Sequence, residues 1–298
     1  MSQETISDQL SWDEFYKNSK NLKKIKKAEP FNRLIAHSKN FYIISGYGAF
    51  TPGYVLIISK EFIPSFGLIK KNLVEELNFM IRVSQDFIKK NYNCESVIFE
   101  HGMCACIGGL DRAHLHIMSI NKASNSKTLK SSIDKVLFNR KAGVKYVKFG
   151  KYKLENIHDI NQIYETQEIV KKYKIIGKIL KLKNLQNLSP EKWPFNTLKH
   201  ISKGGHYVFF RSRYKDSSFL TKHNFQTQFG REVVFENELI TNKNFKKKIL
   251  ELKIKNPNIV PWRWQNLIFE KNIISTIKDA KKTMGVMRLN NFYNFEVI

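Results

Sequence analysis

The sequence is poor in the residues that cross-link a chain or anchor it in a membrane. It has three cysteines in 298 residues, Cys94, Cys104 and Cys106, which are too few for a disulfide framework. Cys104 and Cys106 are one residue apart and no second pair exists, so the usual zinc spacing is missing. No apolar run reaches the ~18 residues of a membrane span, and the polar, acidic start MSQETISDQLSWDEFY is unlike a signal peptide. We therefore expect a cytoplasmic protein with no membrane partner.

Acidic residues are also scarce relative to basic ones. The chain has 26 Asp and Glu against 51 Lys and Arg, a net charge of +25. Such an excess belongs either to a lysine-rich solvated surface or to a protein that binds a polyanion. The lysines are spread along the chain and arginine is a minority of the basic residues, which favours the solvated surface. A nucleic-acid partner stays open, and a nucleotide phosphate suits both cases.

What is plentiful is apolar and aromatic material. Hydrophobic residues make up 42% and aromatic residues 13% of the chain, a globular composition with enough length for a sizeable core. Short β-rich runs and segments of helical period alternate along the first half. The runs RLIAHS, NFYIIS, YVLIIS, SVIFEHG and RAHLHIMSI predict strands, and NLVEELNFMIRVSQDFIKKNY and TLKSSIDKVLFNRK predict helices. This order predicts an α+β fold.

Four regions follow from the composition. Residues 1–29 form a polar lead-in, and residues 30–150 hold the strands and helices above. Residues 151–195 have a charged helical pattern that predicts a connection. Residues 196–298 predict a C-terminal α/β region, with a strand at HYVFFRS and a C-terminal helix, packed on the first domain. Its strand-then-helix order resembles that of the first half, so a degenerate repeat of the first domain stays open.

The segment RAHLHIM contains the main candidate catalytic residues. In a strand, alternate residues face the same way, so Arg112, His114 and His116 share one face, about 6–7 Å apart. Upstream, Gly108 and Gly109 allow backbone N–H groups to approach an anion, because no Cβ intervenes. A neutral imidazole here can attack phosphorus while its neighbour orients it or takes a proton. Arg112 supplies charge against the phosphate oxygens.

The histidine pair by itself also fits other interpretations. Two histidines at alternate positions can be exposed on a sheet or hydrogen-bonded in a core. His-x-His is also a common metal-ligand pattern. A metal-dependent hydrolase using His101, His114 and His116 is therefore a third hypothesis, which chelator-sensitive activity would support.

The segment RAHLHIM resembles the signature of the histidine triad (HIT) superfamily, His-φ-His-φ-His-φ-φ, where φ is apolar. The order around it is also similar: GYGAFTPGYVLIISKEF, a long helix, FEHG, a glycine loop and the histidine strand. Phe-Glu-His-Gly before the triad strand is typical of one microbial HIT-like group. The resemblance covers residues 31–120, and more loosely residues 205–265. It implies an antiparallel sheet flanked by helices.

The resemblance also implies a function, that of a nucleotide hydrolase or nucleotidyltransferase acting at the α-phosphate of a nucleoside conjugate. His114, at the middle triad position, would be the nucleophile that forms a nucleotidyl-histidine intermediate. His116 would bind and orient the phosphate, and Gly108 and Gly109 would form the phosphate-binding loop. Apolar residues of the early strands, around Phe31, Ile43 and Leu56, would wall the base and ribose. The chemistry requires no metal or cofactor, and HIT proteins are often dimers, so a dimer stays open.

One departure from the HIT pattern is Arg112, which stands at the first triad position in place of histidine. Arginine has only donors, so it cannot accept a proton at neutral pH. It can hold phosphate and lower the pKa of a neighbouring imidazole. His101, oriented by Glu100, is a candidate for the missing support. The alternative is a catalytically silent nucleotide- or RNA-binding module, with salt-dependent RNA binding and no turnover. Gln228 and Arg231 fit a helix start from which they could reach the site out of the C-terminal half, and neither is assigned to it.

Overall fold

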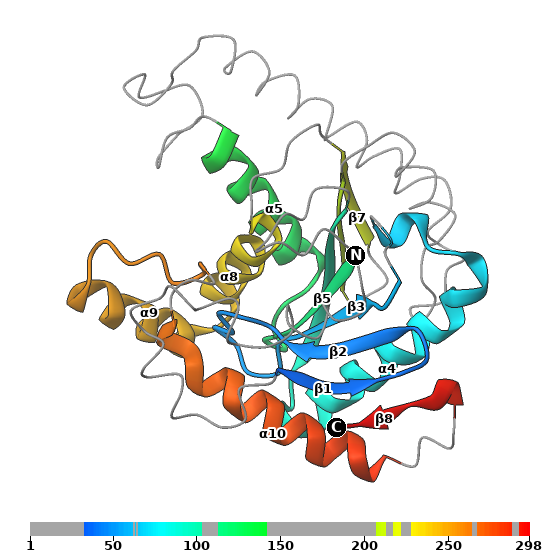
Figure 1. The fold of residues 1–298 in the computed structure, drawn as a ribbon. Helices are drawn as coiled ribbons and strands as arrows, with labels where there is room; N and C mark the ends of the chain where they lie inside the picture. The colour runs from blue at the N-terminus through cyan, green and yellow to red at the C-terminus, as the bar shows by residue number, and fades with distance from the viewer. Residues whose placement is uncertain are drawn as a thin grey trace, which may run out of the picture.

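A single antiparallel sheet organises the chain. The computed structural model describes residues 33–61, 63, 65–102, 113–141, 207–212, 217–221, 228–263, 267–287 and 292–298. Within them eight strands form one sheet (Figure 1). In chain order they are β1 (Leu34–His37), β2 (Phe41–Ser45), β3 (Val55–Ser59), β4 (Glu95–Gly102), β5 (His114–Ile120), β6 (Tyr207–Ser212), β7 (Ser217–Thr221) and β8 (Glu296–Val297). The order across the sheet is β7-β6-β4-β5-β3-β2-β1-β8, and every neighbouring pair is antiparallel.

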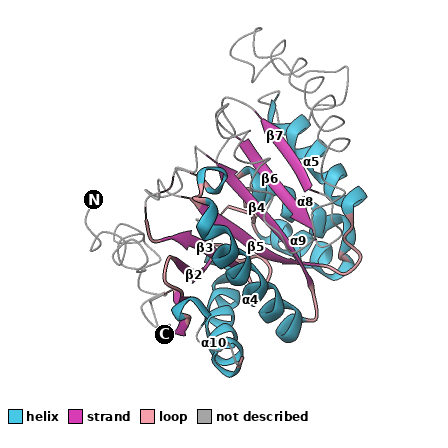
Figure 2. Cartoon of the chain, turned by 90° about the vertical axis from the view of Figure 1, so that its right-hand side faces the viewer, coloured by secondary structure: helices cyan, strands magenta, loops and turns pink. Residues whose placement is uncertain are grey.

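Helices cover both faces of this sheet (Figure 2). The longer ones are α4 (Val74–Tyr92), α5 (Ser126–Lys141), α8 (Phe229–Thr241), α9 (Lys243–Lys255) and α10 (Glu270–Val286). Short 3-10 turns are η1 (Phe66–Leu68), η2 (Lys71–Leu73), η5 (Leu267–Phe269) and η6 (Phe292–Asn294). α4 and α10 lie on one face, while α5, α8 and α9 lie on the other (Figure 2). This mixture of helices and antiparallel sheet confirms the predicted α+β class.

The central strands are buried because helices cover both of their faces. Every residue of β3 and β5 is buried. The sequence of β3, VLIIS, is rich in the β-branched residues that suit a pleated surface between two packed layers. The predicted amphipathic helix is α4, and its buried side includes Leu77, Met80, Ile81, Ser84 and Ile88. It ends at Asn93, whose left-handed backbone (φ 50°) terminates the helix.

The C-terminal elements complete the same sheet. β6 pairs with β4 and β7 with β6 at one edge, and β8 pairs with β1 at the other. These strands of the predicted C-terminal region, residues 196–298, extend the sheet formed by the first half of the chain. Sequence patterns reveal strands but do not reveal which strand pairs with which. The predicted lead-in at 1–29 and connection at 151–195 lie outside the described residues.

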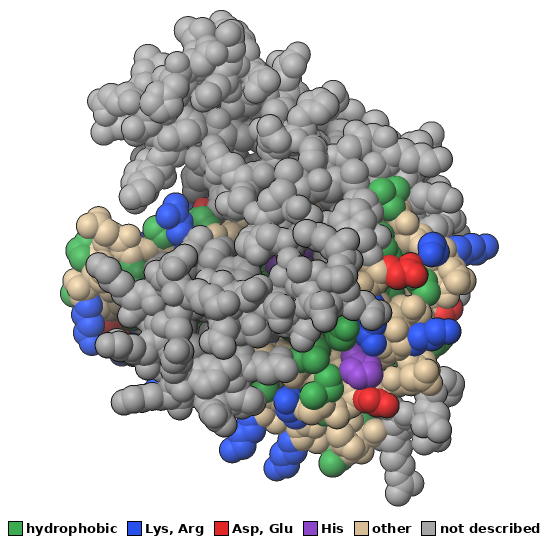
Figure 3. Space-filling view, viewed as in Figure 1, with side chains coloured by type: hydrophobic (Ala, Val, Ile, Leu, Met, Phe, Trp, Pro, Cys, Tyr) green, Lys and Arg blue, Asp and Glu red, His purple; other side chains and the backbone are tan. Residues whose placement is uncertain are grey.

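Basic side chains lie on the surface of the described residues. On the face shown in Figure 3, lysine and arginine side chains are visible at several separate places. α9, with the sequence KNFKKKILELKIK, buries only Phe245 and Ile249, so its lysines lie on a solvated side. In the part of the chain that is described, no helix has the length and apolar character needed to cross a membrane.

Candidate functional site

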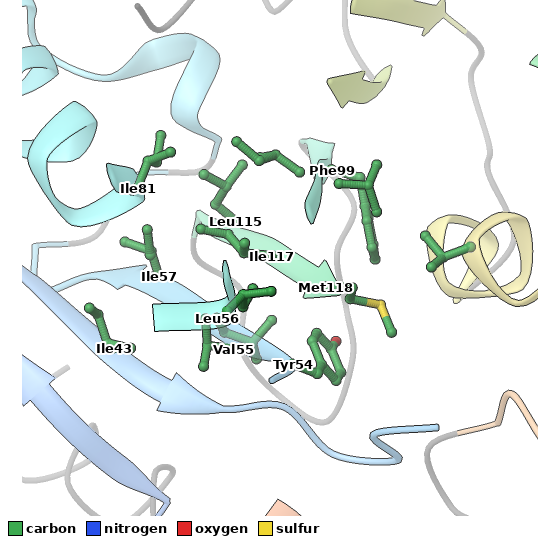
Figure 4. Close-up of a cluster of buried hydrophobic side chains, with 14 of the residues drawn as sticks. Ile43, Tyr54, Val55, Leu56, Ile57, Ile81, Phe99, Leu115, Ile117 and Met118 are labelled. Atoms are coloured by element: carbon green, nitrogen blue, oxygen red, sulfur yellow. The ribbon is translucent and has the colours of Figure 1, made fainter. Parts of the chain in front are cut away.

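The site begins with the side-chain alternation of β5. His114 and His116 are buried, at 5% and 4% exposure, and as alternate residues they lie on one face of the sheet. Leu115 is on the opposite face. Figure 4 shows Leu115 on the side of Ile81 from α4, whereas Met118 lies on the other side of the sheet, near Tyr54. The histidines therefore share the Met118 face, which α8 covers.

Strand pairing gives the histidines their neighbours. His116 lies between Phe99 of β4 and Leu56 of β3, and His114 lies opposite Ile58 of β3. The β4–β5 register, continued by one residue, brings His101 opposite His114. His101 is also buried. The fold thus gathers the three histidines of the predicted catalytic set on one face of two adjacent strands.

The His116 ring is held on three sides. It stacks on Phe99, with ring centroids 4.3 Å apart and planes 7° from parallel. The His114 ring meets it edge-on, with centroids 4.9 Å apart at 65°. Its Nδ1 is 2.6 Å from the Tyr54 hydroxyl oxygen. Ring contact between the two histidines means that a group bound to one lies within reach of the other.

The surroundings of His116 keep its imidazole neutral. Burial lowers the pKa of His116 well below the ordinary value of 6.5, and positive charge on His114, Arg231 and His101 lowers it further. The ring is therefore uncharged at neutral pH, the form in which imidazole can accept or donate one hydrogen bond at each nitrogen.

Arg231 is the main residue that the sequence interpretation left out of the site. It lies in the first turn of α8 and is 2% exposed. Its guanidinium donates to the carbonyl oxygens of Tyr47, Gly48 (2.6 Å) and Trp262 (2.8 Å from Nη2). The guanidinium carbon is also 5.4 Å from the centre of the Tyr54 ring. Arg231 therefore ties the start of α8 to the β2–β3 loop next to the histidines.

Close packing of α8 on the sheet depends on Gly230. A Cβ at this position would lie 2.3 Å from a ring atom of Phe99, the residue that stacks on His116. Gly230 thus allows α8 to press its backbone against the aromatic stack. Tyr54, Phe99 and Gly230 had no local signal in the sequence, and Arg231 had only its position at a helix start in the C-terminal half. Tyr54 lies two residues before Leu56, and alternate strand residues share a face, so Tyr54 could have been predicted to lie on the same face as Leu56.

Substitution of Gly230 by alanine is expected to lower the free energy of unfolding by about 1–3 kcal/mol, because the added methyl group overlaps the Phe99 ring. The matched control is Gly285→Ala in α10, where a Cβ would meet nothing within 4 Å and alanine is the better helix former. Chemical denaturation of both variants measures the difference. Equal stability of the two variants would contradict close packing at Gly230.

Glu100 lies away from the histidines. Adjacent residues in a strand face opposite sides, so Glu100 is on the α4 face while His101 is on the other. Its carboxylate accepts from the Phe66 backbone N–H (2.6 Å) and the Tyr207 hydroxyl (2.5 Å). The hypothesis that Glu100 orients His101 or binds substrate is therefore corrected: Glu100 links η1 to β6 inside the core.

Glu100 predicts a pH dependence of stability. Burial raises its pKa from 4.5 to about 7, against the smaller opposing effects of its Tyr207 and Phe66 hydrogen bonds. The folded protein then binds a proton more tightly than the unfolded chain, so this contribution to stability falls as the pH rises from 4.5 to about 7. Over this pH range the ionisation of Glu100 lowers the free energy of unfolding by about 3 kcal/mol.

Glu100→Gln keeps a side chain of the same shape and removes the ionisation. We expect the loss of stability between about pH 5 and about pH 8 to be smaller in this variant than in the wild type. Denaturant unfolding at the two pH values measures it, with the exposed Glu75→Gln of α4 as control. A wild-type pH profile in Glu100→Gln would mean that Glu100 ionises normally.

Several predicted residues lie outside the described part of the chain. Arg112, Gly108 and Gly109 belong to residues 103–112, as do two of the cysteines. Ile43 pairs with Ile57, on the α4 face, so it does not line a nucleotide site beside the histidines. Leu56 shares the histidine face.

Among the residues that are described, no three His, Cys, Asp or Glu side chains are grouped so that they could hold a metal ion.

Comparison with known proteins gives little further information. No family model matches the sequence, and no curated protein matches it. Among solved structures, the crystal structure of a hypothetical histidine triad nucleotide-binding protein from Sulfolobus tokodaii strain 7 is a neighbour at 14% identity. The match covers 54% of this chain and 96% of that chain, with a TM-score of 0.28. A score this low does not support an assignment of family or function.

Proposed function

We propose that the protein is a HIT-type nucleotide hydrolase or nucleotidyltransferase that acts at the α-phosphate of a nucleoside conjugate, with His114 as nucleophile. The observation that supports this most is the ring contact between His114 and His116, with centroids 4.9 Å apart on one buried face. The neutral state of His116 adds to it. In this arrangement His114 can attack a phosphate while His116 hydrogen-bonds the same phosphate.

In the proposed first step, a ring nitrogen of neutral His114 uses its lone pair to form a bond to the α-phosphorus. The bond from phosphorus to the leaving group breaks, and the leaving group takes the electron pair and a proton from solvent. In the second step water attacks phosphorus, the electron pair of the P–N bond returns to His114, and one proton of the water is released to solvent. The products are a nucleoside monophosphate and neutral His114; an acceptor other than water gives a transferase. His116 hydrogen-bonds the phosphate oxygens, and Arg112, Gly108 and Gly109 hold the phosphate.

In this proposal His101 takes part of the role of the missing first triad histidine. Its position opposite His114 in the β4–β5 register supports that role. We expect His101→Ala to lower turnover, since the nucleophile would lose a neighbour that helps to orient it. Steady-state kinetics beside His114→Ala tests this. Full activity of His101→Ala together with an inactive His114→Ala would rule out the role.

The covalent intermediate tests the proposed function directly. The protein is mixed with a panel of nucleoside conjugates, quenched without acid, and analysed by intact mass and then by peptide mapping. We expect a nucleotidyl adduct on the peptide that carries His114 and none on the peptide that carries His37 of β1. Bound nucleotide or RNA with steep salt dependence, no adduct and no turnover would instead establish the silent binding module. Turnover abolished by a chelator would indicate the metal-dependent hydrolase.

A further inference from the structure

Tyr54 connects the site to α8. It immediately precedes β3 and is 2% exposed. Its ring lies nearly parallel to that of His116, with centroids 5.9 Å apart at 17°. Its hydroxyl oxygen is 2.6 Å from Nδ1 of His116. A bond of this length between two buried groups leaves one question, which of the two supplies the proton.

The position of Arg231 and the burial of Tyr54 indicate that Tyr54 supplies the proton. The guanidinium carbon of Arg231 lies 5.4 Å from the Tyr54 ring centre, close enough for its charge to act on the Tyr54 hydroxyl. Arginine has donors and no acceptor, so the Tyr54 hydroxyl cannot donate its proton to Arg231. Burial raises the pKa of Tyr54 above 10, and the Arg231 charge only partly offsets this, so the hydroxyl keeps its proton. That proton is then directed to Nδ1 of His116.

We infer that Tyr54 and Arg231 are positioning residues that hold His116 in a single neutral tautomer, with the proton on Nε2. The inference rests on the proposed function and adds a role to it. With Nδ1 occupied as an acceptor, His116 presents Nε2–H to the substrate. It then acts as a hydrogen-bond donor to a phosphate oxygen while His114 attacks, and it does not act as a base.

The charged and titratable groups that face His116 agree with this state. They come from three elements: His114 on β5, His101 on β4 and Arg231 on α8. Each of them, when positively charged, disfavours a second proton on His116. Tyr54 adds a hydrogen bond that only an unprotonated Nδ1 can accept. Charge selects the neutral ring, and Tyr54 selects the tautomer.

The test uses Tyr54→Phe in the full chain, which removes the hydroxyl and keeps the ring. The ¹⁵N chemical shifts of the His116 ring report its tautomer and its protonation. In the wild type we expect one Nε2–H tautomer across about pH 6–8. In Tyr54→Phe we expect a mixture of tautomers and protonation at a higher pH. Turnover should fall about tenfold with little change in nucleotide affinity, because one orienting hydrogen bond is lost.

The matched control is Tyr92→Phe. The Tyr92 hydroxyl donates to Asp279 of α10 at 3.0 Å, on the other side of the sheet, so the His116 shifts should stay those of the wild type. Unchanged His116 shifts in Tyr54→Phe would overturn the inference, as would a wild-type Nδ1–H tautomer. The readout is independent of activity. If wild-type protein forms no adduct but Tyr54→Phe changes the tautomer, the positioning role stands and the proposed function fails.

Discussion

Replacement of His114 by alanine is expected to lower turnover by about 10³- to 10⁴-fold or more, with the nucleotidyl adduct lost altogether. A nucleophile has no substitute when it forms the covalent bond, and the residual rate comes from binding and electrostatic stabilisation alone. His116→Ala is expected to cost less, about 10- to 100-fold, because it removes a hydrogen-bonding group and leaves the nucleophile in place. Measurement of kcat and kcat/KM on the conjugate that gives the adduct separates the two.

His37→Ala is the control for this experiment. His37 lies on β1, with its Nε2 3.5 Å from a carboxylate oxygen of Glu296 and its side chain 26% exposed. Loss of one ion pair with an exposed carboxylate changes little, so we expect turnover close to that of the wild type. A His114→Ala protein within tenfold of the wild type would place the nucleophile elsewhere, and the same measurement on His101→Ala would then identify the next candidate.

Local pattern was enough to predict the centre of the fold. The alternation in HLHIMSI predicted that His114 and His116 share a face, and the structure confirms it by the ring contact between them. The helical period of NLVEELNFMIRVSQDFIKKNY predicted α4, whose buried side includes Leu77, Met80 and Ile81. Both predictions depend only on residues a few positions apart, where backbone geometry fixes the direction of each side chain.

The same local reasoning failed where closeness in sequence was taken for closeness in space. Glu100 and His101 are neighbours in the chain, yet the strand sends them to opposite faces, and Glu100 bonds with Tyr207, more than a hundred residues away. The pleat itself would have predicted this separation. The assignment of Glu100 was therefore an avoidable error.

The contacts of Arg231 could not have been predicted in this way. Its partners, the carbonyls of Tyr47 and Gly48, are more than 180 residues upstream, and backbone carbonyls leave no trace in a sequence. Its residue type gave the opposite expectation, since arginine is usually exposed. The pairing of β6 beside β4 brings the C-terminal half alongside the site, and that pairing also had no local signal.

Arg231→Met tests how far the fold depends on this buried guanidinium. Methionine keeps much of the apolar stem but leaves the carbonyls of Tyr47, Gly48 and Trp262 without their donor. Buried acceptors without a partner cost about 1–3 kcal/mol each. We therefore expect the free energy of unfolding to fall by about 3–5 kcal/mol, a large part of the ~5–15 kcal/mol that stabilises a typical domain.

The matched control is Arg82→Met on the exposed side of α4, which should stay within about 0.5 kcal/mol of the wild type. Equilibrium unfolding in urea measures both variants. If Arg231→Met were as stable as Arg82→Met, the three carbonyls would have to find water or other donors, and the tie between α8 and the β2–β3 loop would not be structural. Because the charge of Arg231 lowers the pKa of His116, a stable Arg231→Met protein would isolate this electrostatic effect, and the pKa of His116 should rise.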